Sequence, residues 1–187
     1  MIFWFCGLSG AGKSTVAEAV CTRLTADGHS VLMLDGDVVR ENFHKTLGFS
    51  AADIAENNAL IAKLCVEGSN RHDVVIVPII SPLDHARKAA RREIGPGFRL
   101  VWCRSPVEVV AERDVKGLYA MAAAGKIDDL IGYSANGIAF EEPEDADLIL
   151  ETGREGPEAS IDTFYQYVRG ELGRRDSGAG QQDEIGK

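Results

Sequence analysis

The sequence predicts an α/β fold of three layers, in which helices cover both faces of a central parallel sheet. Short apolar runs recur along the chain, and stretches with helical spacing separate them. This alternation is typical of strand–helix–strand units, whose strands pair in parallel. Because helices cover a parallel sheet on both faces, its strands are continuous apolar runs, as they are here.

Five apolar runs are the predicted strands. They are MIFWFCGL, SVLMLDGD, DVVIVPIISP, FRLVWCRSP and ADLILET. After the first run, KSTVAEAVCTRLTADG places Val16, Val20 and Leu24 on one face of a helix, and Gly28 is its predicted stop. In such a sheet, ligands bind at the carboxyl ends of the strands.

Composition limits the class of protein. A chain of 187 residues with 45% apolar and 26% charged residues is typical of one globular domain. The net charge of −9 argues against binding to a nucleic acid polymer or an anionic membrane, because both need a basic surface. An anionic small molecule would therefore have to meet positive charge placed locally.

Cysteine usage and hydropathy indicate a cytoplasmic protein. The four cysteines stand singly in apolar surroundings, without the spacing of a metal or redox site, and are predicted to be buried thiols. We find no export signal before the first strand and no apolar run of about 18 residues that would span a membrane.

The predicted organisation is a single domain over residues 1–173. Within it, residues 111–144 lack a strand-like apolar run, and we interpret them as a helix with a mobile loop that acts as a lid. Residues 174–187 combine Gly, Gln and charge without an apolar face, which predicts a flexible C-terminal tail.

The segment GLSGAGKS fits the phosphate-binding pattern G-x-x-x-x-G-K-[ST], directly after a strand and before a helix. Glycines let successive N–H groups point at phosphate oxygens, the lysine reaches the β- and γ-phosphates, and the hydroxyl ligates Mg²⁺. We therefore predict a P-loop NTPase or kinase fold that binds ATP and Mg²⁺. The predicted nucleotide-binding residues are Gly7, Ser9, Gly10, Ala11, Gly12, Lys13, Ser14 and Thr15.

Two acids follow the second strand, in LDGDVVR. Asp35 and Asp37 lie at a carboxyl end, beside the predicted phosphate site. One carboxylate can hold Mg²⁺, a role we give to Asp35 with Ser14, and the other can accept the proton of an attacking hydroxyl. The alternative is an acidic turn with a helix cap.

Three further stretches complete a pattern of motifs. They are LGFSAADIAEN at residues 47–57, IISP at residues 79–82 and RDVKGLYAMAAAG at residues 113–125. In this order and at these spacings the chain resembles the adenylylsulfate (APS) kinase family, over residues 2–150. The resemblance implies a kinase that transfers the γ-phosphoryl group of MgATP to the ribose 3′-hydroxyl of APS, and it implies a homodimer.

The resemblance also implies roles for single residues. Lys13, Asp37, Arg113 and Lys116 resemble the catalytic residues, with Asp37 as the base and the last two on the lid. We expect the other predicted substrate-binding residues to contact a nucleotide-like acceptor, and Phe49 resembles an aromatic that stacks on adenine. These residues are Asp35, Arg40, Phe49, Asn57, Ser81, Arg87 and Phe140.

The chain departs from the family pattern on the acceptor side. After GFS the family usually reads D-R-x-x-N-I-R-R, whereas this chain has Ile54, Ala59 and Leu60 where arginines are expected. Asp84 replaces a basic residue, and Leu130 replaces an aromatic of the lid. None of these side chains grips phosphate or sulfate oxygens as a guanidinium does.

These departures leave three alternatives open. In the first, Arg40, His85 or Arg87 supplies the missing charge and APS is the acceptor. In the second, the pocket holds a different nucleotide conjugate, such as a cytidine diphosphate derivative, and a hydroxyl is still phosphorylated. In the third, the chain is a non-catalytic ATP-binding module, against which Asp37, Arg113 and Lys116 argue.

Overall fold

The computed structural model describes residues 1–36, 39 and 47–179 and has the predicted α/β architecture. Its five strands pair in parallel, in the order β2-β3-β1-β4-β5. Every predicted apolar run contributes one strand. The strands are β1 (Ile2–Cys6), β2 (Val31–Met33), β3 (Val74–Val77), β4 (Phe98–Cys103) and β5 (Leu148–Leu150).

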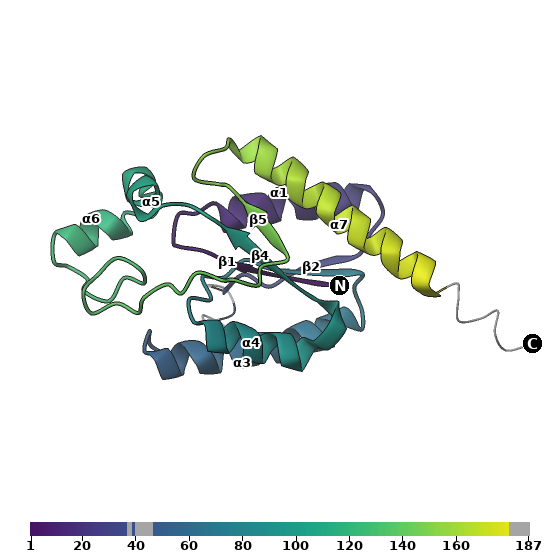
Figure 1. Ribbon diagram of the computed structural model, residues 1–187, viewed down its shortest axis with the longest axis horizontal. Coiled ribbons are helices and arrows are strands. Elements are labelled where there is room, and N and C mark those ends of the chain that lie inside the picture. The colour runs from purple at the N-terminus through teal and green to yellow at the C-terminus, as the bar shows by residue number, and fades with distance from the viewer. Residues whose placement is uncertain (37–38, 40–46, 180–187) are drawn as a thin grey trace, which may run out of the picture.

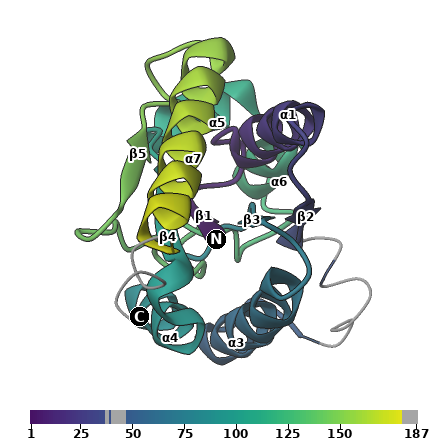
Figure 2. The same cartoon turned by 90° about the vertical axis from the view of Figure 1, so that its right-hand side faces the viewer.

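Helices form a layer on each side of the sheet, as Figures 1 and 2 show. Helices α1 and α7 cover one face, and α3 and α4 cover the other. The described helices are α1 (Lys13–Ala26), α3 (Ala51–Ser69), α4 (Asp84–Ile94), α5 (Val107–Arg113), α6 (Leu118–Ala123) and α7 (Pro157–Ala179), with a 3₁₀ turn at Gly95–Gly97. Among them we find no helix with the length and apolarity that crossing a bilayer requires.

Strand β1 divides the core in two because its side chains alternate between the faces. Phe3 and Phe5 join the cluster under α1 and α7, where both rings meet Phe164 edge-on. Ile2 and Trp4 join the cluster under α3 and α4. Every residue of β1 is buried, so the strand fixes the base of the loop that follows it.

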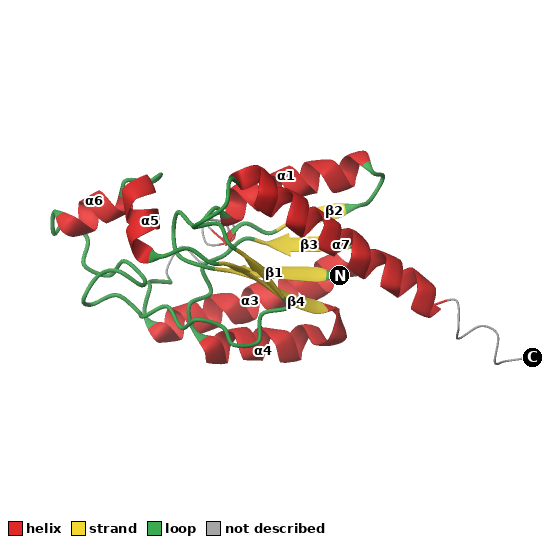
Figure 3. Ribbon diagram, turned by 45° about the horizontal axis from the view of Figure 1, so that its top comes forward, coloured by secondary structure: helices red, strands yellow, loops and turns green. Residues whose placement is uncertain are grey.

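The parallel pairing brings the carboxyl ends of all five strands to one edge of the sheet. Figure 3 shows long loops at this edge, and α5 and α6 lie beyond it. These two short helices occupy part of the predicted lid at residues 111–144, and the remainder has no regular helix or strand. Loops far apart in the sequence therefore meet where a parallel sheet binds its ligands.

The prediction of a tail from residue 174 is wrong at its start, because α7 continues to Ala179. Arg174 donates a hydrogen bond to Glu171 one turn earlier, and the same carboxylate pairs with Arg99. Sequence hydropathy does not show these ion pairs, which lie near the residue where the tail was predicted to begin. Residues 180–187 lie outside the described part of the chain.

The cysteines lead to the first testable prediction. Burial raises the pKa of Cys6, Cys65 and Cys103 to about 12 and that of Cys21 to about 11. Since only the thiolate is nucleophilic, the native protein should react slowly with a disulfide reagent at pH 8, and all four thiols should react after unfolding in guanidinium. Rapid labelling of the native protein would show that the thiols are accessible.

Candidate active site

The loop between β1 and α1 forms the expected phosphate cradle. Gly7 has φ +142°, and a Cβ there would lie 2.6 Å from the Cys103 carbonyl oxygen. Gly12 stands just before α1 with φ +84°. Both positions therefore require glycine, the first because β4 approaches closely and the second because the backbone turns into the left-handed region. The first N–H groups of a helix have no partner within the helix and can bind an anion, and α1 begins directly after this loop.

Lys13 places its ammonium group inside this loop. Its Nζ donates to the carbonyl oxygens of Gly7 at 3.0 Å and Leu8 at 2.7 Å, and the side chain is largely buried. The charge is therefore held beside the backbone N–H groups that would contact phosphate oxygens. This is the geometry predicted for a lysine that reaches the β- and γ-phosphates.

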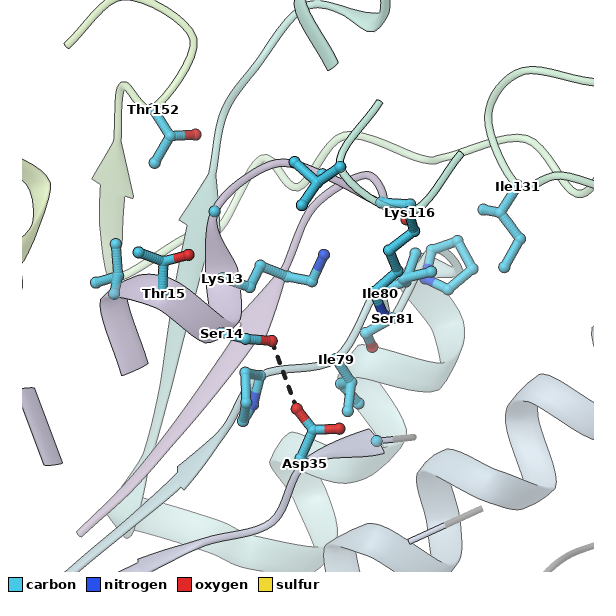
Figure 4. Close-up of a pocket in the computed structure, with 18 of the residues that line it drawn as sticks. Lys13, Ser14, Thr15, Asp35, Ile79, Ile80, Ser81, Lys116, Ile131 and Thr152 are labelled. Carbon is cyan, nitrogen blue, oxygen red and sulfur yellow. Dashed lines mark hydrogen bonds between the residues drawn. The ribbon is translucent and has the colours of Figure 1, made fainter. Parts of the chain in front are cut away.

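Ser14 and Asp35 face each other across the same site. The Ser14 hydroxyl donates to Asp35 Oδ2 at 3.4 Å, the contact drawn as a dashed line in Figure 4. Two hard oxygen ligands next to the phosphate cradle fit Mg²⁺, which keeps several waters and binds few protein groups. The described residues contain no cluster of three His, Cys, Asp or Glu side chains that would hold a metal without phosphate.

A single cavity of about 460 Å³ joins the cradle to the loops after β2, β3 and β5. Its size lies within the range of roughly 300–1,000 Å³ that is usual for small-molecule sites. In Figure 4, Thr15 and Thr152 lie at one end, Lys13 and Ser14 in the middle, and Ser81 and Ile131 toward the other. The cavity therefore has space on both sides of the phosphate cradle.

The end near β5 contains residues that the sequence analysis missed. Thr152, Glu155 and Pro157 line it, between β5 and the start of α7. Arg113, which was predicted, also lines the cavity and donates to the Thr152 carbonyl at 2.8 Å. A usable signal existed, because Thr152 ends the fifth predicted strand and ligands bind at such ends.

The opposite end carries the predicted acceptor residues of α3 and the loop after β3. Phe49, Asn57 and Ser81 all line the cavity. Phe49 is 48% exposed and precedes a capping box in which Ser50 and Asp53 bind each other's backbone N–H groups. An exposed ring anchored at a helix start offers a flat face to a nucleobase.

The predicted lid is attached to the phosphate cradle by a buried tyrosine. Tyr119 Oη donates to the carbonyl of Ser9 at 2.9 Å, and burial raises the pKa of the phenol to about 12. Asp114 accepts hydrogen bonds from the N–H groups of Tyr119 and Ala120, which fixes the start of α6. Lys116, between these residues, lines the cavity as predicted.

Two predicted substrate residues do not line the cavity. Arg87 is buried, and it donates to the carbonyl oxygens of Ser81 at 2.8 Å and Glu141 at 2.7 Å. Phe140 lies against the lid loop, with the Arg87 guanidinium 5.9 Å from its ring centre. Neither side chain lines this cavity in the structure, and Arg87 uses two of its N–H groups to join two backbone segments.

Only one of the three missing arginines would face the cavity. Ile54 is buried and lines it, packed with Leu83 and Ile131. Ala59 is exposed elsewhere on α3, and Leu60 packs against the core cluster under that helix. The acceptor side has therefore lost less charge than the motif comparison indicates.

The other predicted site residues have simple placements. Gly7 and Ala11 shape the loop without lining the cavity, whereas Ser9, Gly10, Gly12 and Thr15 line it. Asp84 forms ion pairs with Lys88 and Arg87 at the start of α4. Asp37 and Arg40 lie outside the described residues.

Comparison with known proteins agrees with this geometry. A family model described as adenylylsulphate kinase matches residues 1–151. The adenylyl-sulfate kinase of Paraburkholderia xenovorans (strain LB400) is 41% identical over 167 residues, which are 89% of this chain and 92% of that protein. The adenylyl-sulfate kinase of Halothermothrix orenii is 43% identical over 169 residues, which are 88% of this chain and 87% of that protein.

A solved structure has the same fold over nearly the same length. The Mycobacterium tuberculosis APS kinase CysC, in complex with AMPPNP and APS, matches with a TM-score of 0.78 and 36% identity. The match covers 87% of this chain and 94% of that chain.

The contact between Tyr119 and Ser9 leads to a second prediction. Tyr119→Phe keeps the ring but removes the hydrogen bond that joins α6 to the phosphate cradle. We expect the KM for ATP to rise about 3- to 10-fold, because one buried carbonyl loses its donor. Tyr133→Phe is the matched control, because Tyr133 meets the Tyr119 ring edge-on and is itself an exposed residue of the lid. Equal effects of both changes would contradict a specific role for the Tyr119 hydroxyl.

Proposed function

Because the chain belongs to the adenylylsulphate kinase family, we propose that it transfers the γ-phosphoryl group of ATP to the ribose 3′-hydroxyl of APS. The observation that carries the proposal is the single cavity, which joins the phosphate cradle to a wall made of Phe49, Asn57 and Ser81. A donor nucleotide on one side of Lys13 and an acceptor on the other would bring phosphoryl group and hydroxyl together.

In the proposed reaction, the acceptor hydroxyl oxygen bonds to the γ-phosphorus as the bond to the β-phosphate bridging oxygen breaks, and ADP leaves. Lys13, Arg113 and Lys116 surround the cavity and would balance the charge that spreads over the phosphoryl oxygens. Asp37 follows Asp35 by two residues and is the proposed base for the hydroxyl proton. Its role is based on the sequence, since it lies outside the described residues.

Mg²⁺ is part of the proposal, with Ser14 and Asp35 as its protein ligands. When bound, the ion neutralises phosphate charge and orients the β- and γ-phosphates. Residues 111–144 are the proposed lid, whose Arg113 and Lys116 already line the cavity. We also propose a homodimer, which family membership supports, and a cytoplasmic location, which the use of ATP supports.

The proposal is tested by the products of the purified protein with MgATP and APS. We expect ADP and a product heavier than APS by one phosphate. Lys13→Ala should lower the turnover about 100-fold or more, because a charge aimed at the phosphates is lost. Lys63→Ala removes an exposed charge of α3, outside the cavity and the lid, and should leave the turnover unchanged.

Failure of the wild type with APS would contradict the proposed acceptor. Transfer to another nucleotide conjugate would keep the kinase and replace APS. ATP binding without phosphoryl transfer to any conjugate would favour the non-catalytic ATP-binding module.

A second acceptor class is favoured by the apolar wall around Ile54. This side chain is buried in the cavity lining with Leu83, Ala86 and Ile131 behind it, where the family pattern has arginine. Arg87 and His85 do not line the cavity, so neither supplies the missing charge. A nucleotide conjugate of a different shape, such as a cytidine diphosphate derivative with a sugar or alcohol hydroxyl, could place a less polar part against this wall than the sulfate of APS.

Ile54→Arg separates the two acceptor classes. If the wild type binds APS without a cation here, the new guanidinium should lower the KM for APS about 10-fold, through charge-assisted hydrogen bonds. Ala59→Arg is the matched control, because it adds the same charge to an exposed position of α3. Ile54→Met controls for packing without charge.

The result depends on the first assay. An active wild type with an improved Ile54→Arg variant supports APS as the acceptor. The second class is supported if the wild type does not phosphorylate APS but phosphorylates another conjugate, and if Ile54→Arg abolishes that activity. An equal gain in Ala59→Arg would mean that the effect is one of overall charge.

A further inference from the structure

Ser81 is the centre of a buried hydrogen-bond network under the acceptor end of the cavity. Its Oγ accepts from Trp4 Nε1 at 3.0 Å and from Asn58 Nδ2 at 2.9 Å. Ser81 and Asn58 are almost fully buried, and both line the cavity. The network joins β1, α3 and the loop after β3 at one oxygen atom.

The backbone of Ser81 is held as firmly as its side chain. Its φ of +41° lies in the left-handed region, which serine seldom adopts. The Arg87 guanidinium donates to its carbonyl at 2.8 Å, and the neighbouring Ile80 carbonyl accepts from the Gly7 N–H at 3.2 Å. Such a conformation persists only where the surrounding contacts determine it, and functional sites are where it is common.

A serine hydroxyl has two acceptor positions and one proton. Trp4 and Asn58 occupy both acceptor positions of Ser81, so its remaining capacity for hydrogen bonding is donation. We propose that Asn58 is a positioning residue. It fixes the Ser81 hydroxyl as a donor to an unprotonated oxygen or ring nitrogen of the bound acceptor nucleotide, an inference that rests on the proposed function.

A neighbouring side chain also points to a ligand at this wall. Asn57 lines the cavity and is 6% exposed, and its Oδ1 is buried with no hydrogen-bond partner among the described residues. A buried acceptor atom without a donor is costly unless a ligand supplies one. The wall therefore combines the Ser81 hydroxyl, which can donate, with an amide oxygen of Asn57 that has no partner among the described residues.

Asn58 distinguishes this chain from the pattern it otherwise resembles. In D-R-x-x-N-I-R-R, isoleucine occupies the position of Asn58, and isoleucine cannot donate a hydrogen bond. With Trp4 as its single donor, a serine would keep one acceptor position, and its proton could rotate. Asn58 removes this freedom and makes the wall selective for acceptor atoms.

Two substitutions of Asn58 test the proposal, with APS as the probe. Asn58→Asp keeps the size but places a carboxylate where the amide donor was, so the Ser81 proton should turn to it. We expect the KM for APS to rise about 10-fold while the KM for ATP stays within about twofold. Asn58→Leu removes the donor without adding an acceptor and should have a smaller effect, because the proton can still reach the ligand.

A double-mutant cycle separates positioning from direct contact or loss of packing. In the Ser81→Ala background, Asn58→Asp should leave the KM for APS unchanged, since the hydroxyl through which it acts is gone. Independent, additive effects would overturn the proposal. So would parallel increases in the KM values for both substrates, which would indicate a general disturbance of the fold.

A readout without substrate keeps the test independent of the proposed function. In the ¹⁵N spectrum of the unliganded protein, the Asn58 side-chain amide should exchange slowly with solvent, and Ser81→Ala should make this exchange faster. No difference between the two proteins would overturn the inference even if APS is not the acceptor. If Ser81→Ala speeds up the slow exchange of the Asn58 amide but the protein does not phosphorylate APS, only the proposed acceptor is contradicted.

Discussion

The parallel alignment of β1 with β3 and β4 is the constraint on which the site depends. Strand β1 is the central strand and is buried along its whole length, so the loop that follows it begins from a fixed point. Its first residue, Gly7, lies against the Cys103 carbonyl at the end of β4 and donates to Ile80 after β3. The cradle is therefore held on both sides by neighbouring strands. A shift of either strand would displace Lys13 and Ser81 together.

The two ends of the cavity rely on different kinds of interaction. The end that holds the phosphate cradle has Lys13 beside carbonyl oxygens and Arg113 beside Thr152, so charge is placed by hydrogen bonds to the backbone. The acceptor end has an apolar wall around Ile54 and the hydrogen bonds of Ser81. A charge contributes over several ångströms, whereas a hydrogen bond acts only in a narrow range of direction and distance. Selection at the acceptor end therefore depends on geometry more than on charge.

The sequence was sufficient for the sheet, the cradle and part of the cavity lining, because these follow from local patterns. Apolar runs mark strands wherever a sheet is covered on both faces, and the P-loop works through its own backbone. Local patterns could not predict the hydrogen-bond partners of Arg87. Whether a guanidinium faces a ligand or joins two carbonyls depends on segments 54 residues apart. The contact between α7 and β4 likewise joins residues far apart in the sequence, because Arg99 donates to Glu171.

The phase of α3 decides how the acceptor side should be compared with its family. At about 100° per residue, Ile54, Asn57 and Asn58 lie on one side of the helix, and Ala59 lies about 140° from Ile54. A comparison of the linear motif gives equal weight to the missing arginines at positions 54, 59 and 60, although only position 54 of these lines the cavity. The same rotation brings Asn58 to Ser81, where isoleucine would supply no hydrogen bond. The change at this wall is therefore the loss of one guanidinium together with the gain of one amide. The amide acts through the Ser81 hydroxyl, to which Trp4 also donates, while Arg87 donates to the carbonyl of the same residue.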